Sequence, residues 1–527
     1  MEQPNSGYIH RNRILTRRRF LAITGASAAG LLLAGVYGCG DDGGDDEAAR
    51  PSGDDLRFLS LEDAAKLIAA KEVSPVDLTE AALARIERLQ PQLVAFITIT
   101  AEQALAQARA AEKEIAAGNY RGTLHGIPIA HKDQFDTKGV RTTSGSKVFA
   151  DRVPDEDAAV VARLADAGTV SVGKLNMWEF AAAIAGVNEH WGTVRNPWDV
   201  DRLPGGTSAG SGAATAAGLV YAATGEDTGG SIRHPASFCG VVGLMPTYGR
   251  VSLHGMFPPS PGTLDHAGPL ARTVRDTAVV LQVMAGRDPR DTRTADVPVP
   301  DYLDGIEQGP KGLRIGVPRD YFWNGMAPEV ESVARKAIAD MERAGAEVRE
   351  VPFVQAQAYY DAYRVVFAIE TAITHADIYP SHKADYGADL ASLLELVPGT
   401  EAQLRDQLRE PLDVVARARG GEADALLDGV DVLAMPTTRQ PPMTIEEAEG
   451  ILERGDVLEA EAKADFYNTT IFDLTGQPAV SLPCGLTSAG LPVGLMLVAR
   501  QWDEPTLLRA ARAYEMVRGP FPSPPIT

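Results

Sequence analysis

The chain has 527 residues and a mass of 56.0 kDa, with 45% hydrophobic and 23% charged residues, which is typical of a folded globular protein and excludes global disorder. Its 50 basic against 71 acidic residues give a net charge of -21, which argues against a general nucleic-acid binder because such a surface repels phosphate backbones. Three cysteines without paired metal-ligand spacing exclude a disulfide-stapled mini-fold and a zinc-ribbon site.

The first 39 residues form a separate basic and apolar segment. Five arginines stand there against the single acid Glu2, and Arg17–Arg19 directly precede an apolar run over Phe20–Tyr37. This order predicts an export signal of the twin-arginine type, and so a periplasmic or cell-surface location. A transmembrane anchor is the alternative, although the run is short and rich in glycine for a spanning helix.

Cys39 ends a stretch, Val36–Cys39, that resembles a bacterial lipoprotein cleavage box. Lipid attachment at Cys39 would hold the protein at a membrane, and simple cleavage or an unremoved anchor is the alternative. A polar Gly/Asp-rich linker over residues 40–56 follows. The folded domain is therefore expected at residues 57–520.

Helix signals come first after the linker. Ser60 with Asp63, and Ser74 followed by Pro75, are typical of helix starts, and Gly118 is typical of a helix end. Helices are predicted at 64–70, from 75 onward, at 101–117 and at 158–167. Short apolar runs between Gly- and Pro-rich loops predict strands at 170–172, 219–224, 241–244 and 313–317. Strands alternating with helices, without a linker-like break over residues 58–518, predict one large α/β domain with a buried sheet.

Two Gly/Ser-rich loops stand out within Pro204–Arg233. Thr228-Gly229-Gly230-Ser231 can turn successive N–H groups inward, which would stabilise an oxyanion beside the Ser231 hydroxyl. A phosphate-binding or structural glycine loop is the alternative, but no lysine follows as it does in a Walker motif.

A second nucleophile candidate is Ser208, because Gly206–Gly210 matches the G-x-S-x-G elbow of α/β hydrolases. That fold needs a buried strand before the elbow and a late histidine. Neither is present, since Asp201-Arg202-Leu203-Pro204 precedes the match and the last histidine is His382. The proton acceptor for a serine must then be another group, and a lysine can serve if burial lowers its pKa from ~10.4 toward about 7–8.

Several further stretches share one family's motifs in the right order. They are residues 124–133, 173–181, 240–252, 265–274 and 476–479, beside the two Gly/Ser-rich loops. With them the chain resembles the amidase signature family over nearly its whole length beyond the export segment. The resemblance implies a single large α/β domain with a central mixed β-sheet flanked by helices. It also implies amide hydrolysis by a Ser–cis-Ser–Lys triad, without metal or cofactor.

By this resemblance Lys132 is the base and Ser231 the nucleophile, and the oxyanion hole is Thr228, Gly229, Gly230 and Ser231. The family's interval to the nucleophile places Thr207 at the cis-Ser position, which is a departure, and implies a cis peptide bond there. A threonine hydroxyl can still relay a proton. Three outcomes follow: Thr207 substitutes with an altered rate, which is the preferred one, Ser208 takes over, or the protein is inactive.

Two other groups are expected near the site. Asp227 and Arg233 flank the nucleophile loop and are expected to pin it by ionic hydrogen bonds, with a plain surface pair as the alternative. Tyr359, Tyr360, Tyr363 and Phe367 have the spacing of one helix face, and could equally line a specificity pocket.

The expected function is that of an exported amidase, a hydrolase acting on the C–N bonds of a small-molecule amide. One rival is the glutaminase-type component of a tRNA-dependent amidotransferase (its A subunit), which residues 225–252 resemble and which the export segment and the net acidity contradict. The other is a catalytically inactive, amide-binding lipoprotein, for which Thr207 is the only support.

Overall fold

The computed structural model describes residues 56–258, 262–455, 459, 463 and 465–526. All of them belong to Arg50–Thr527, one of two units into which the chain divides. The predicted export signal, Cys39 and the linker up to residue 55 lie outside the described residues. Within the described ranges, every helix is too short or too polar to cross a membrane.

One mixed sheet of eleven strands organises the described residues. The strands are β1 (Phe96–Ile99), β2 (Pro128–Lys132), β3 (Val170–Leu175), β4 (Ala222–Asp227), β5 (Val242–Met245), β6 (His266–Ala271), β7 (Arg314–Pro318), β8 (Glu347–Val351), β9 (Val432–Pro436), β10 (Ala479–Leu486) and β11 (Pro492–Val498). Their order across the sheet is β1-β3-β2-β4-β6-β5-β10-β11-β9-β7-β8.

Strand direction decides where the ends of β2 and β4 meet. Strands β3, β2 and β4 run parallel, as do β9, β7 and β8, whereas the pairs from β4 to β9 across the sheet, and β1 with β3, are antiparallel. Because β2 and β4 are parallel neighbours, their carboxyl ends lie at the same edge of the sheet.

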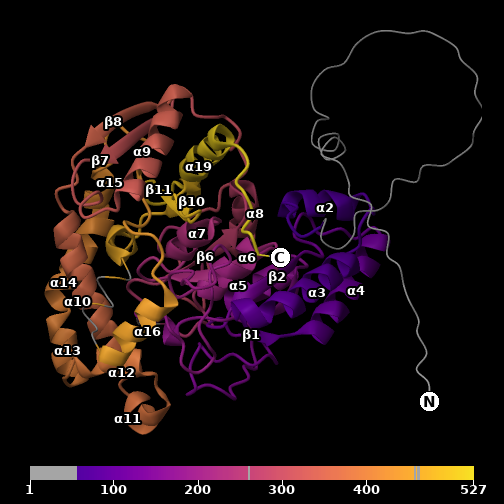
Figure 1. Ribbon diagram of the computed structural model, residues 1–527, viewed down its shortest axis with the longest axis horizontal. Coiled ribbons are helices and arrows are strands. Elements are labelled where there is room, and N and C mark those ends of the chain that lie inside the picture. Colours follow the sequence, from indigo (N-terminus) through magenta and orange to yellow (C-terminus); the bar gives the residue numbers. More distant parts are fainter. Residues whose placement is uncertain (1–55, 259–261, 456–458, 460–462, 464, 527) are drawn as a thin grey trace, which may run out of the picture. The chain divides into compact units, whose positions relative to one another are not determined.

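Helices cover the sheet from both sides. They are α2 (Leu61–Ala69), α3 (Pro75–Leu93), α4 (Ala101–Ala116), α5 (Ala159–Asp166), α6 (Ala209–Ala216), α7 (Arg233–Cys239), α8 (Val274–Met284), α9 (Pro328–Arg343), α10 (Ala356–His375), α11 (Tyr379–His382), α12 (Ala388–Glu395), α13 (Glu401–Gln407), α14 (Arg409–Arg417), α15 (Ala423–Ala425), α16 (Ile445–Arg454), α18 (Thr470–Thr475) and α19 (Glu504–Arg518). Helices α9 and α19 pack together on β10 and β11, and α6 and α7 pack together on the central strands. Figure 1 shows α2, α3 and α4 gathered near β1 and β2, and α10 to α14 gathered in orange on the opposite side of the view.

The local signals in the sequence explain these elements. Ser60 caps α2 by accepting from the Asp63 N–H at 3.0 Å, and Ser74 forms a full capping box with Asp77 at the start of α3. The predicted helices and strands are confirmed to within three residues at each end, and β4 is shifted as a whole, because it begins and ends three residues later than predicted. The predicted single large α/β domain with a mixed sheet flanked by helices is confirmed.

Helix α6 is built almost entirely of small residues, and all of it is buried. A Cβ atom on Gly210 would lie 2.5 Å from the Asn176 carbonyl oxygen, and one on Gly212 would lie 2.7 Å from Pro235. Only glycine fits at these two positions. The close packing brings the loop before α6 against the loop that follows β4.

Candidate active site

Lys132, Thr207 and Ser231 meet at the shared edge formed by the ends of β2 and β4. Lys132 is the last residue of β2, Thr207 lies in the loop before α6, and Ser231 lies in the loop between β4 and α7. All three are buried, and Lys132 is 0% exposed. Segments some 100 residues apart in sequence (residues 132 to 231) thus place an amine and two hydroxyls in one small, buried volume.

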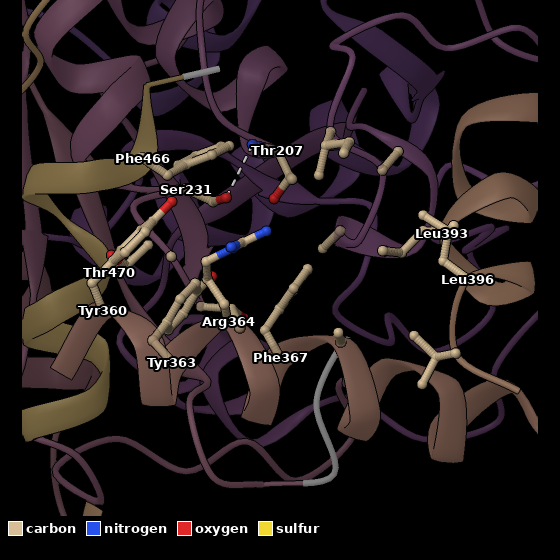
Figure 2. A pocket seen from close by; sticks show the side chains of 17 residues that line it. Thr207, Ser231, Tyr360, Tyr363, Arg364, Phe367, Leu393, Leu396, Phe466 and Thr470 are labelled. Atoms are coloured by element: carbon tan, nitrogen blue, oxygen red, sulfur yellow. Dashed lines mark hydrogen bonds between the residues drawn. The ribbon is translucent and has the colours of Figure 1, made fainter. Parts of the chain in front are cut away.

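Thr207 contacts both of the other groups. Lys132 Nζ lies 2.8 Å from Thr207 Oγ1, and the backbone N–H of Thr207 donates to Ser231 Oγ at 3.1 Å. Figure 2 shows the hydroxyl oxygens of Thr207 and Ser231 at the same end of a cavity, with this hydrogen bond dashed. The Thr207 hydroxyl thus contacts the amine, while its backbone N–H holds the Ser231 hydroxyl.

The peptide bond at Thr207 differs from the expectation. The described residues contain no cis peptide bond, so the cis bond that the family resemblance implies at this position is wrong for this structure. A trans bond is the ordinary state of a non-proline residue. Here the turn into Thr207 is made instead by Gly205 and Gly206, whose φ values of +80° and +58° favour glycine.

Ser208 is held by strand β4 rather than placed between Lys132 and Ser231. Its hydroxyl donates to the Glu226 carbonyl oxygen at 3.1 Å and accepts from the Glu226 N–H at 3.3 Å. The single hydroxyl proton is therefore used on the backbone of β4. This geometry favours Thr207 over Ser208 for the bridging position.

Glu226, which the sequence motifs did not single out, pairs directly with Lys132. Glu226 Oε2 lies 2.9 Å from Lys132 Nζ, and both side chains are wholly buried. Burial lowers the pKa of Lys132 below its usual 10.5, and the nearby Glu226 opposes this. Burial likewise raises the pKa of Glu226, and Lys132 opposes that. The sequence carries one signal for this pair, since a glutamate inside a buried strand needs a partner.

Asp227 and Arg233 hold the loop that carries Ser231. Asp227 accepts from the N–H groups of Gly230 and Ile232 at 2.5 and 3.0 Å, and from Arg233 Nε and Nη2, each at 3.0 Å. Arg233 Nη2 also donates to Asp473 Oδ2 at 2.7 Å, across 240 residues of sequence. Burial alone would raise the pKa of Asp227, but Arg233 and the loop N–H groups hold it well below its usual value. The pair is thus internal and ionic, not a surface pair.

The N–H groups of the glycine loop are not all free to face a substrate. The Gly230 N–H, expected in the oxyanion hole, donates to Asp227 in this structure. A Cβ on Gly229 would lie 2.3 Å from Tyr363 Oη, and one on Gly230 would lie 2.4 Å from Thr469 Oγ1. A side chain at either glycine would have to displace one of these hydroxyls. The N–H groups of Gly229 and Ser231 remain the candidates for binding an oxyanion.

Thr228 faces the acidic groups behind the site. Its hydroxyl contacts Glu226 Oε1 and lies 2.8 Å from Asp265 Oδ1. Thr228 also lines the cavity at Ser231. In the described ranges, no three His, Cys, Asp or Glu side chains converge as metal ligands do.

A cavity of about 200 Å³ opens at Ser231 and Thr207. Its walls are mainly apolar, with Ile184, Leu393, Leu396, Val397 and Phe466 among the lining residues. Helix α10 supplies one wall, and Figure 2 shows Tyr360, Tyr363, Arg364 and Phe367 rising from it, with the Arg364 guanidinium directed toward the two hydroxyls. Of the residues that line this cavity, Arg364 alone is charged.

The aromatic group expected on one helix face divides in the structure. Tyr360, Tyr363 and Phe367 line the cavity, whereas Tyr359 is buried in the core, where its ring lies 6.2 Å from that of Phe353. Helix spacing alone did not separate the two environments, because residues 359 and 360 lie only about 100° apart around a helix.

Comparisons with known proteins identify the family of the chain. The family model described as Amidase matches residues 77–508. The A subunit of glutamyl-tRNA(Gln) amidotransferase from Anaeromyxobacter sp. (strain K) is 42% identical over 494 residues, which cover 89% of this chain and 98% of that protein.

Solved structures match as well. Peptide amidase from Stenotrophomonas maltophilia has a TM-score of 0.77 and 31% identity, covering 89% of this chain and 99% of that chain. The A subunit of glutamyl-tRNA(Gln) amidotransferase from Thermotoga maritima has a TM-score of 0.71 and 31% identity, covering 90% and 99%. The chain therefore belongs to the amidase family.

Proposed function

We propose that the chain hydrolyses carboxylic amide C–N bonds through an acyl-enzyme on Ser231. The observation that supports this most strongly is a wholly buried lysine amine 2.8 Å from the hydroxyl of Thr207, whose backbone in turn holds Ser231 Oγ. A lysine whose pKa is lowered by burial can be uncharged and act as a base.

The acylation step uses the contact between Lys132 and Thr207 and requires the Thr207 hydroxyl to accept from Ser231 Oγ, which the Thr207 backbone N–H holds beside it. Neutral Lys132 accepts the proton of Thr207 Oγ1 while Thr207 Oγ1 accepts that of Ser231, whose oxygen attacks the amide carbonyl carbon. The negative charge on the carbonyl oxygen is stabilised by the N–H groups of Gly229 and Ser231. The C–N bond then breaks, the proton returns through Thr207 to the departing nitrogen, and the acyl group remains as an ester on Ser231.

Deacylation reverses the roles. A water molecule enters in place of the amine, gives its proton through Thr207 to Lys132 and attacks the ester carbonyl. The ester bond to Ser231 Oγ breaks, Ser231 takes a proton back, and a carboxylic acid leaves. No step requires a group from outside the chain except the substrate and water.

Substitution of Thr207 tests the relay. Thr207→Ala removes the hydroxyl but keeps the backbone N–H that holds Ser231, so kcat/KM on a chromogenic anilide is expected to fall by about 10²-fold or more. Thr207→Ser keeps a hydroxyl with a freer χ1 and is expected to stay within about tenfold of the parent protein. An alanine variant with full activity would show that the relay does not pass through Thr207.

The cavity favours a substrate with an apolar acyl group. Its lining is mainly aliphatic and aromatic; Arg364 is its charged member, and none of the lining residues is acidic. Each buried CH₂ of a substrate contributes about 0.8 kcal/mol. The lining therefore suits a neutral or anionic amide better than one that carries an ammonium group.

A second candidate is the glutaminase activity of the A subunit in a tRNA-dependent amidotransferase. The sequence comparisons favour it, because the Anaeromyxobacter relative of that type is 42% identical and is covered almost end to end. The reaction at Ser231 is the same in this case, but the substrate is glutamine. The complete amidotransferase acts on glutamyl-tRNA(Gln). The cavity lining speaks against it, since the ammonium group of glutamine finds no carboxylate there.

Rates on a small amide panel separate the two candidates. The full chain is expected to hydrolyse alkyl and aryl primary amides with kcat/KM at least about tenfold above that for glutamine, because two or more buried CH₂ groups are worth roughly that factor. Arg364→Gln is expected to lower kcat/KM most for amides that carry a distal carboxylate. A preference for glutamine would contradict the first candidate and favour the second.

We also propose export of the protein, with lipid attachment at Cys39 as one route to the membrane. The support is the order of arginines, apolar run and Cys39 in the sequence. A reporter fused to residues 1–50 is expected outside the cytoplasm, and its retention in the cytoplasm would favour the amidotransferase candidate. A third candidate, an inactive amide-binding lipoprotein, predicts no reaction of Ser231 with a fluorophosphonate.

A further inference from the structure

Behind Lys132, the side chains of Glu226, Thr228 and Asp265 form a row of contacts that the proposed mechanism does not use. Glu226 Oε2 lies 2.9 Å from Lys132 Nζ, its other oxygen contacts Thr228 Oγ1, and Thr228 Oγ1 lies 2.8 Å from Asp265 Oδ1. All four side chains are buried, with exposures between 0% and 2%. A wholly buried carboxylate beside a proposed base must affect how that base holds a proton.

The position of Thr228 between two carboxyl groups decides how many protons Glu226, Thr228 and Asp265 share. A hydroxyl has one proton to donate, so Thr228 Oγ1 cannot donate to both Glu226 and Asp265. Both contacts are nevertheless within hydrogen-bond distance. One of the two carboxyl groups must therefore be protonated and donate to Thr228.

Asp265 is the better place for that proton. In the described part of the chain its second oxygen, Oδ2, is buried without a hydrogen-bond partner, which is costly for an ionised carboxylate. Both oxygens of Glu226, by contrast, have partners, Lys132 and Thr228. Burial, and then the charge of Glu226, raises the pKa of Asp265 well above its usual value. The hydrogen bonds then run from Asp265 to Thr228 and from Thr228 to Glu226.

We propose that Glu226 is a positioning residue for Lys132: as a carboxylate it fixes Lys132 Nζ against Thr207, and it balances the positive charge that Lys132 acquires with the Ser231 proton. This inference rests on the proposed function. It adds Glu226 to the three-residue relay as the counter-ion of Lys132. It also assigns a proton to Asp265, so that Asp265 is neutral and places no second negative charge beside Glu226.

Other charged groups that face Lys132 or Asp265 have partners of their own. Lys132 also faces Asp227, which Arg233 holds in an ion pair. Asp265 also faces Glu370 and Arg293, and Arg293 pairs with Asp291 at 2.6 Å. Of the described acidic side chains, Glu226 is the one in direct contact with Lys132 Nζ.

The test is the pH dependence of Ser231 labelling by a fluorophosphonate, measured on the full chain. The labelling rate of the parent protein is expected to rise with pH as Lys132 loses its proton. In Glu226→Gln the opposite charge is gone, which lowers the pKa of Lys132, so the rising limb is expected to move about 1–3 pH units toward acid. The plateau rate is expected to fall by about tenfold, because a less basic lysine with no counter-ion is a weaker base.

Matched variants separate this role from a structural one. Asp265→Asn keeps a neutral donor toward Thr228, so its rising limb is expected at the parent pH. If Asp265 were ionised instead, this change would also move the limb toward acid, which would overturn the assignment even if Glu226→Gln failed to fold. Glu504→Gln neutralises another wholly buried glutamate, paired with Arg250 at 3.2 Å, and is expected to lower the melting temperature without moving the limb.

The outcomes also distinguish this inference from the proposed function. If Ser231 of the parent protein is not labelled at any pH, the proposed function fails. If Ser231 is labelled and Glu226→Gln, shown to be folded by thermal unfolding, gives the parent profile, the proposed function stands and the role of Glu226 is refuted. Glu226→Asp, which keeps the carboxylate, is expected to return the limb toward the parent pH.

Discussion

Ser231→Ala is expected to lower kcat/KM for amide hydrolysis by on the order of 10⁴–10⁶-fold, because the variant has no oxygen to form the acyl-enzyme. The loss is expected in kcat, since the cavity walls that bind the substrate are unchanged. The change removes one oxygen that accepts from the Thr207 N–H, so thermal unfolding is expected to shift by only a few degrees. Initial rates and melting temperatures on the same preparations give both quantities.

Ser211→Ala is the matched control for this substitution. Ser211 is also wholly buried, and its hydroxyl donates to the Thr224 carbonyl oxygen at 2.9 Å within the same packed region. Its loss is expected to affect stability by about 1 kcal/mol and to leave turnover nearly unchanged. If Ser231→Ala kept more than about a hundredth of the parent activity, the nucleophile would have to be another residue.

Lys132→Met is expected to lower kcat/KM by about 10³-fold or more, since it removes the base while filling the same volume. Lys174→Met is the control, because Lys174 is a second wholly buried lysine, bonded to Thr142 Oγ1 at 2.8 Å, and lies outside the proposed relay. Burial lowers the pKa of Lys174 to about 8. The control is expected to lose stability but to keep Ser231 reactive.

The same Lys132→Met change has a pH-dependent cost in stability. It leaves Glu226 buried without its cation, so the pKa of Glu226, already raised by burial, rises further. A carboxyl group whose pKa is higher in the folded than in the unfolded state binds more protons when folded, and the free energy of unfolding then falls as the pH rises. The melting temperature of the variant is therefore expected to lie further below that of the parent protein in alkaline buffer than in acid buffer. A loss independent of pH would contradict the pairing.

Local sequence signals predicted much of the fold. Ser60 and Ser74 begin α2 and α3 because their hydroxyls satisfy backbone N–H groups that a helix start leaves free. The apolar run predicts a strand at residues 219–224, whereas β4 covers Ala222–Asp227. The strand in fact runs on through Glu226 and Asp227, which a buried strand tolerates because Lys132 and Arg233 neutralise them.

The site itself was predicted in part. The family motifs predict that Lys132, Thr207 and Ser231 lie together, and in the structure Thr207 contacts both of the other residues. The pairing of Glu226 with Lys132, and of Asp473 with Arg233, depends on which strands are neighbours and on contacts across up to 240 residues. A glutamate within a buried strand signals that it needs a partner, but the local sequence does not say which residue that partner is. Nor could spacing reveal that the Gly230 N–H is used by Asp227.

The most direct test of the lysine-driven relay is the rate at which a fluorophosphonate modifies Ser231, with the modified residue identified by peptide mass spectrometry. We expect the adduct on Ser231 in the parent protein and in Lys174→Met, and a rate at least about 10²-fold lower in Lys132→Met. An adduct on any other residue, or equal rates with and without the Lys132 amine, would contradict the account.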